Sequence, residues 1–203
     1  MTFDYSKYIP AFAILVFLTL VVWSSLTTRP ESDEGSFASP ALNLAQNGHF
    51  GTTVFETENT GLTRINERTY WVMPLFLLNA SVSFKILGYG LFSMRLVSIL
   101  WGLILLISWY LIILKLSEKR MYAAISTALL GCSYVISATA TIARPDTMCA
   151  SLGFASFAVY LWMRERNLLS AILISQTLVV LAGLTHFLGI FSLFRTAFFN
   201  LLL

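Results

Sequence analysis

Apolar runs long enough to cross a lipid bilayer recur along most of this 203-residue chain. A helix that crosses the hydrocarbon core needs about 20 mainly apolar residues, and the runs in this sequence are about 17 to 20 residues long. Hydrophobic residues make up 57% of the chain and charged residues 11%, whereas an ordinary soluble domain has about 25% charged residues. The sequence therefore predicts an all-α polytopic membrane protein and excludes a soluble globular domain.

About six transmembrane helices are predicted. The first is expected to remain uncleaved, because it lacks an Ala-x-Ala site and is longer than the apolar part of a secretory signal. The last run contains Arg195 and reaches the end of the sequence, so residues 1–203 are expected to be an incomplete amino-terminal module. The predicted spans are Ile9–Leu26, Leu96–Leu114, Tyr122–Ala140, Met148–Trp162, Leu168–Leu184 and Leu188–Leu203.

Residues 27–93 are predicted to form a long first exoplasmic loop with juxtamembrane helices. The polar part of this loop holds six of the ten acidic residues of the chain, which makes it the expected place for chemistry. The pair Ser39–Pro40 predicts a helix start and Gly48 predicts a stop, so a short helix is expected over Ala41–Asn47. The face that this helix would turn toward the membrane consists of Phe37, Ala41 and Leu44.

The segment Trp71–Gly88 is apolar but carries several polar side chains, and it is predicted to lie in the membrane interface without crossing. With this topology five cations become cytoplasmic, as the positive-inside rule requires. The acidic loop, the turn at Arg144 and the turn at His186 then share the exoplasmic face. The interfacial stripe would be Met73, Leu77, Ala80, Phe84 and Leu87, and the cytoplasmic cations would be Lys115, Lys119, Arg120, Arg164 and Arg166.

The adjacent acids Asp33 and Glu34 follow the first span by a few residues and should lie near the membrane surface. A carboxylate held there can take a proton from an attacking hydroxyl or amine, a role that general-base catalysis rewards by about 100- to 10,000-fold. The structural alternative is a solvated acidic turn in which Asp33 caps the next helix.

Four segments resemble one family, the GT-C superfamily of polyprenyl-phosphate-sugar-dependent glycosyltransferases, which includes protein O-mannosyltransferases and the lipid A aminoarabinose transferase. The segment beginning at Asp33–Ala38 resembles the Asp-Glu motif of the family's first exoplasmic loop. Met73–Gly88 and Ser93–Ser98 resemble its Pro-Pro-Leu, Phe-Gly and Ala-Arg-Leu-Pro-Ser series, and Ala143–Asp146 resembles a recurrent turn.

This resemblance implies an inverting membrane glycosyltransferase whose donor is a polyprenyl or dolichyl phosphate sugar. Asp33 would be the general base or would orient the acceptor, and Glu34 would support it. The acceptor would be a lipid, a glycan or a protein on the exoplasmic side of a bacterial inner membrane or an equivalent bilayer.

Cations near the departing phosphate would lower the barrier, because negative charge develops there as the glycosidic bond breaks. The donor-binding candidates are Arg64, Glu67, Arg68, Arg144, Asp146 and His186. The alternatives are structural. Arg64 and Arg68 could pair with Glu67 or with membrane phosphates, and Asp146 could orient Arg144 or cap the following helix. His186 could have only a structural role in its turn.

No cofactor is firmly implied. A divalent cation that bridges Asp33 or Glu34 to a phosphate remains open, because hard cations choose oxygen ligands. Nucleic acid is not expected as a partner, since the thirteen Lys and Arg residues are scattered among loops. Two other functions stay open: a membrane transporter, and a non-catalytic fragment or scaffold.

Overall fold

The computed structural model describes residues 8–52, 54, 61 and 63–190, and within these ranges all regular structure is helical. The α-helices are joined by short connections, apart from the longer segment between α2 and α4. The elements are α1 (Ile9–Thr27), α2 (Ser32–Asn47), α4 (Pro74–Leu87), α5 (Leu91–Ser117), α6 (Arg120–Gly131), α7 (Tyr134–Thr141), α8 (Pro145–Met163), α9 (Leu168–Gly183) and the 3₁₀ helix η2 (Phe187–Ile190).

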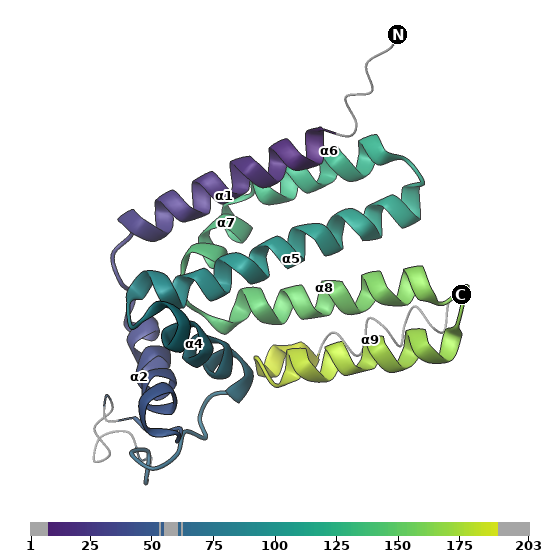
Figure 1. Cartoon of the computed structure of the whole chain (residues 1–203). Helices are drawn as coiled ribbons and strands as arrows, with labels where there is room; N and C mark the ends of the chain where they lie inside the picture. Colours follow the sequence, from purple (N-terminus) through teal and green to yellow (C-terminus); the bar gives the residue numbers. More distant parts are fainter. Residues whose placement is uncertain (1–7, 53, 55–60, 62, 191–203) are drawn as a thin grey trace.

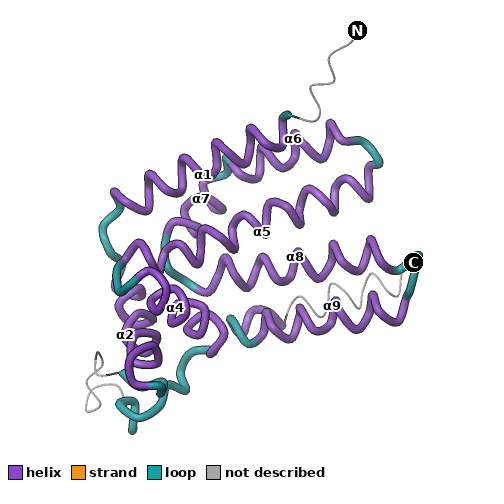
Figure 2. The backbone as a smooth tube through the Cα atoms, viewed as in Figure 1, coloured by secondary structure: helices purple, strands orange, loops and turns teal. Residues whose placement is uncertain are grey.

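Helices α1, α5, α6, α8 and α9 run side by side, and helices α2 and α4 gather at one end of this array (Figure 1). The tube view in Figure 2 shows that loops connect the helices at the two ends of the array. The carboxyl ends of α1 and α9 and the amino ends of α5 and α8 meet α2 and α4 (Figure 1). At this end, henceforth the α2–α4 end, segments far apart in the sequence come together.

Two helices, α1 and α5, are long and apolar enough to cross a membrane, and a third span results if the bent pair α6 and α7 counts as one. Helices α6 and α7 meet at an angle of 58° at a break after Gly131. Helices of this kind are typical of an integral membrane protein. The six predicted spans are not confirmed: α9 has 16 residues, and most of the expected span Leu188–Leu203 lies outside the described residues.

Helix α4 occupies most of the segment predicted to lie flat. Its 14 residues are too few to cross, because at 1.5 Å per residue they cover about 21 Å of a hydrocarbon core about 30 Å thick. The predicted interfacial stripe was wrong, however: Leu77, Ala80 and Phe84 pack inside the protein. The exposed apolar side of α4 carries Leu78, Val82 and Ile86 instead.

Helix α2 is about twice as long as predicted and begins at Ser32, so Pro40 lies inside it. Proline was a misleading start signal, because α2 begins upstream of it with a capping box, in which the N–H of Glu31 donates to the carboxylate of Glu34. Its predicted end is confirmed, since Gly48 has the left-handed φ of 78° that favours glycine. The apolar face expected to meet the membrane packs on α4 instead, with Ala41 fully buried.

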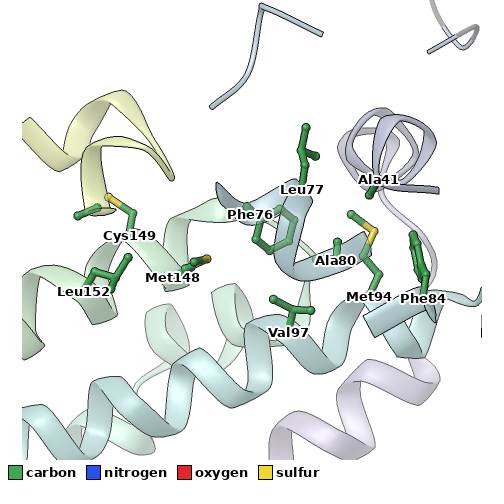
Figure 3. Close-up of a cluster of buried hydrophobic side chains, with 12 residues drawn as sticks. Ala41, Phe76, Leu77, Ala80, Phe84, Met94, Val97, Met148, Cys149 and Leu152 are labelled. Carbon is green, nitrogen blue, oxygen red and sulfur yellow. The ribbon is translucent and has the colours of Figure 1, made fainter. Parts of the chain in front are cut away.

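A hydrophobic cluster holds α2 and α4 against the long helices (Figure 3). Phe76 and Leu77 of α4 pack among side chains of α5 and α8, and each is almost fully buried. Burying a side chain of this size contributes roughly 1.5–3 kcal/mol. The cluster comprises Ala41, Phe76, Leu77, Ala80, Phe84, Met94, Val97, Ala143, Met148, Cys149, Leu152 and Ala182.

Helices α1, α5 and α7 approach one another closely at Gly102. A Cβ atom on Gly102 would lie 2.9 Å from Cζ of Phe17 and 3.2 Å from Cβ of Ala140. Phe17 and Ala140 are fully buried, so neither can move without disturbing the core.

We expect Gly102→Ala to lower the Tm of the full chain in detergent. Overpacking costs about 1–3 kcal/mol, which exceeds the gain of up to about 1 kcal/mol in helix propensity. Gly183→Ala is the matched control, because it gains the same propensity and a Cβ there meets nothing within 4 Å. Equal Tm changes for the two variants would contradict the tight contact.

Candidate functional site

The centre of the α2–α4 end is a fully buried ion pair between Arg95 of α5 and Glu34 of α2. The side chains are 0% and 2% exposed. Nε of Arg95 donates to Oε1 of Glu34 at 2.7 Å, and Nη2 donates to Oε2 at 2.7 Å. Arginine can make this two-pronged contact because its guanidinium is a planar fork, which a lysine cannot reproduce.

Arg95 also binds the main chain where α1 ends. Its Nη1 donates to the carbonyl oxygens of Ser25 at 2.7 Å and Thr28 at 3.0 Å, and its Nη2 donates to the carbonyl oxygen of Arg29 at 3.1 Å. The last carbonyls of a helix lack partners within the helix and carry partial negative charge. Arg95 therefore closes α1 and fixes the short linker that leads to α2.

Glu34 in turn binds two backbone N–H groups. The N–H of Glu31, the residue before α2, donates to Oε2 at 2.9 Å, and the N–H of Ala143, two residues before α8, donates to Oε1 at 2.8 Å. Together Arg95 and Glu34 join the end of α1, the start of α2, helix α5 and the segment before α8. We call this group the Arg95–Glu34 junction.

The junction keeps the Glu34 carboxylate charged although it lies inside the protein. Burial raises the pKa of Glu34, but the hydrogen bonds from Arg95, Ala143 and Glu31 lower it by more, so the pKa is below its usual value of 4.5. A carboxylate that accepts several hydrogen bonds prefers its ionised form. The supporting role that the resemblance implies for Glu34 stays a prediction.

Asp33 lies beside the junction but faces solvent. Its carboxylate is 51% exposed and pairs with Nη1 of Arg144 at 3.1 Å. Nε of Arg144 donates to Oδ2 of Asp146 at 2.9 Å, so the guanidinium lies between two carboxylates. These three side chains, here called the Asp33–Arg144–Asp146 cluster, carry a formal charge of −1 and are partly open to water.

The cluster joins the amino ends of two helices. Asp33 is the second residue of α2 and Asp146 is the second residue of α8. Acidic side chains in a first helical turn are stabilised by the free N–H groups there. Neither acid is the N-cap of its helix; Glu31 and Arg144 hold those positions.

The turn that carries Arg64, Glu67 and Arg68 is exposed. Nε of Arg64 donates to Glu67 at 2.9 Å, which is the structural alternative considered for this pair. The hydroxyl of Tyr70 closes the turn by bonding to the N–H and the carbonyl of Thr63. Within the described ranges, no ion pair connects this turn to Asp33 or Arg144.

An aromatic pocket of about 170 Å³ opens at the same end of the array. Pro145, between Arg144 and Asp146, lines it, and so does Phe37, one helical turn after Asp33. The predicted site residue His186 also forms part of its wall. The described lining consists of Phe37, Tyr70, Trp71, Val72, Met73, Phe76, Pro145, Thr185, His186 and Phe187.

A larger groove of about 410 Å³ lies between α4 and α5. It begins at Leu96 and Val97, which directly follow Arg95. Its two polar side chains are engaged with the backbone: Asn79 donates to the carbonyl of Leu75, and Ser83 donates to that of Ser93. The groove surface is therefore almost entirely apolar, with Leu78, Val82, Ile86, Leu87, Leu100 and Trp101 completing it.

The described residues contain no group of three or more potential metal ligands. The carboxylates of Asp33 and Asp146 both pair with the guanidinium of Arg144.

Arg95 was not among the predicted site residues, although its motif was part of the resemblance. Its position inside an apolar run was the available signal, because a charged residue there costs at least about 2.5–3.5 kcal/mol unless it is paired. Arg195, which the last predicted span contains, lies outside the described residues.

Comparison with known proteins yields one relative of limited extent. An uncharacterized protein of Aquifex aeolicus is 27% identical over 132 residues, which cover 64% of this chain and 24% of that protein. The chain therefore matches about a quarter of the length of this relative. No family model matches the chain. No solved structure matches it either.

We expect Arg95→Met to destabilise the full chain by about 3–5 kcal/mol, because it leaves the Glu34 charge buried without its partner. Adding Glu34→Gln should restore part of this loss, since the two residues act as one unit. Arg64→Ala, which breaks an exposed pair with Glu67, should change the stability far less, because solvent screens that pair. Thermal unfolding in detergent measures all of these; additive losses for the two junction substitutions would contradict the coupling.

Acid should weaken the same junction. The pKa of Glu34 is lowered in the folded protein, so its contribution to stability is fully present above its ordinary pKa of 4.5 and is lost as the pH falls through the lower folded value. We therefore expect Tm to fall on acidification below about pH 4.5. Glu34→Gln should flatten this part of the Tm–pH curve, and an unchanged acid limb would contradict the assignment.

Proposed function

We propose that the protein to which this chain belongs is a membrane glycosyltransferase that moves a sugar from a polyprenyl or dolichyl phosphate to an exoplasmic acceptor, with inversion at the sugar carbon. One observation carries the proposal: the Asp33–Arg144–Asp146 cluster places an exposed carboxylate 3.1 Å from an arginine, next to apolar helices that could span a membrane. The resemblance of the Asp33 and Arg144 segments to the GT-C superfamily supports the same chemistry.

Asp33 would act as the general base. Its half-exposed carboxylate can accept the proton of an acceptor hydroxyl or amine as that atom attacks C1 of the donor sugar. The bond between C1 and the phosphate oxygen breaks in the same displacement, and the lipid phosphate leaves with the bonding electron pair. Attack from the face opposite the leaving group inverts the anomeric centre.

Arg144 would stabilise the departing phosphate. A guanidinium can offer two parallel N–H donors to phosphate oxygens, and the charge that it neutralises is greatest as the bond breaks. A phosphate bound to Arg144 would compete with Asp33 for the same guanidinium. Donor binding would thereby loosen the Asp33 ion pair and free the carboxylate for the acceptor, while Asp146 kept Arg144 in place.

The groove between α4 and α5 offers a place for the lipid tail of the donor. Its apolar surface suits an isoprenoid chain, and it begins next to Arg95, which also holds the segment carrying Asp33. Covering this groove would bury Val82 and Ile86, which are otherwise exposed. Apolar area removed from water contributes about 25 cal/mol per Å².

A transporter is the second candidate, and the bend between α6 and α7 favours it. Discontinuous helices of this kind are typical of transporter binding sites. The break, however, lies at Gly131–Ser133 and carries no charged side chain, whereas the cluster of charges lies at the α2–α4 end. Sugar flux into sealed vesicles without transfer to an acceptor would support the transporter over the transferase.

We expect Asp33→Asn to reduce transfer by about 100- to 10,000-fold, because the amide cannot take up the acceptor proton. The assay follows a radiolabelled sugar from synthetic polyprenyl-phosphate sugars to a lipid acceptor, with the full chain in proteoliposomes. Tm measurements on the same samples separate loss of the base from loss of folding.

Glu165→Gln is the matched control for this experiment. Glu165 is an exposed acid in the connection between α8 and α9, paired with Lys115 at 2.9 Å, and its loss should leave transfer unchanged. Normal transfer by Asp33→Asn would overturn the assignment of the base. Absence of transfer by the unmodified chain would favour the non-catalytic scaffold.

A further inference from the structure

We propose that the aromatic pocket beside the Asp33–Arg144–Asp146 cluster binds a single uncharged pyranose ring, and that the Nε2–H group of His186 donates a hydrogen bond to one of the ring hydroxyls. This inference rests on the proposed function, because it adds a subsite for a sugar to a site proposed to transfer one.

The walls are rings that hold one another in place. Phe37 stacks on Trp71, with ring centroids 6.3 Å apart and planes 24° apart, and Phe76 meets Phe37 edge-on at 5.9 Å. Aromatic faces carry partial negative charge and attract the C–H groups on the apolar face of a sugar ring. Because Phe37 lies in α2 and Phe76 in α4, the packing of these helices fixes the wall.

The opposite wall is a turn held firmly at the end of α9. The N–H of Leu75 in α4 donates to the carbonyl of Leu184 at 3.0 Å, and the N–H of Gly189 donates to the carbonyl of His186 at 2.8 Å. A Cβ on Gly189 would lie 2.5 Å from backbone atoms of Ala182 and Gly183, so glycine alone permits this close approach. The His186 ring is therefore positioned by the backbone of the turn.

The turn also selects the tautomer of His186. The N–H of Leu188 donates to Nδ1 of His186 at 3.2 Å, so Nδ1 must present a lone pair. In the neutral imidazole the proton then resides on Nε2, which becomes a donor. The ring lines the pocket and stacks on Phe187 at 4.5 Å, so this donor belongs to a wall that is otherwise mostly aromatic.

Charge and size select the ligand class. None of the described lining residues carries a formal charge, and the volume of about 170 Å³ is well below that of a pocket for a drug-sized ligand. One neutral ring with hydroxyl groups fits both conditions. A prenyl chain would leave the His186 donor without a partner, and the apolar groove between α4 and α5 suits such a chain better.

The test measures binding of methyl mannopyranoside, glucopyranoside and galactopyranoside to the purified full chain by saturation-transfer NMR. Trp71→Leu and His186→Asn should each weaken binding of the preferred pyranoside by roughly threefold to tenfold. The asparagine can still accept from Leu188 but lacks a donor at the Nε2 position. His186→Gln, which restores that donor, should recover much of the binding.

Two variants serve as controls. Trp23→Leu removes an exposed tryptophan of α1 and should leave pyranoside binding unchanged. Glu165→Gln should also bind the pyranoside as the unmodified chain does, because Glu165 does not line the pocket and pairs with Lys115 instead. Unchanged binding in both Trp71→Leu and His186→Asn would overturn the subsite, as would displacement of the pyranoside by a short prenol at equal concentration.

Transfer assays on the same preparations separate this subsite from the proposed function. Pyranoside binding that depends on Trp71 and His186, without any transfer, would retain the subsite and count against the transferase. Transfer with unchanged KM values in Trp71→Leu and His186→Asn would support the transferase and count against the sugar subsite. A higher KM for the lipid-phosphate sugar assigns the ring to the donor, and a higher KM for a glycan acceptor assigns it to the acceptor.

Discussion

The pairing of Arg95 with Glu34 is the interaction on which the α2–α4 end depends. Two charges removed from water are tolerated only if they satisfy each other and if their remaining donors and acceptors are also used. Here Arg95 engages three carbonyls at the end of α1, and Glu34 engages two backbone N–H groups next to α2 and α8. The pair thus fixes the relative positions of segments that the hydrophobic cluster alone would hold less specifically.

The neighbouring acids Glu34 and Asp33 have different environments in this arrangement. Glu34 is buried and holds the backbone, whereas Asp33 is half-exposed and pairs with Arg144. Arg144 directly follows Ala143, whose N–H is bound by Glu34, so the same carboxylate positions both partners of the exposed ion pair. The proposed base and the proposed phosphate ligand are therefore placed by a single buried group.

The sequence predicted the helical class and the end of α2 at Gly48, because these depend on composition and local backbone preference. It did not predict the beginning of α2, although Glu31 and Glu34 form a local capping box there. The bonds that Glu34 makes with Arg95 and Ala143 could not be predicted, because these residues lie far away in the chain. The faces of α2 and α4 were assigned to the membrane for a similar reason: an apolar stripe indicates burial but does not indicate what covers it. The expected topology placed the Asp33 loop and the Arg144 turn on one face but did not predict the ion pair between them. The aromatic pocket could not be predicted, because it depends on how the helices pack.

The contacts of Arg95 at the end of α1 have a consequence for how this region can vary. The linker between α1 and α2 supplies main-chain oxygens, from Thr28 and Arg29, and any amino acid can supply these. Successive residues of a helix point about 100° apart, so inserting one residue before Asp33 would rotate that acid toward the interior and Glu34 away from Arg95. The linker should therefore accept substitutions readily during evolution, while its length stays constant.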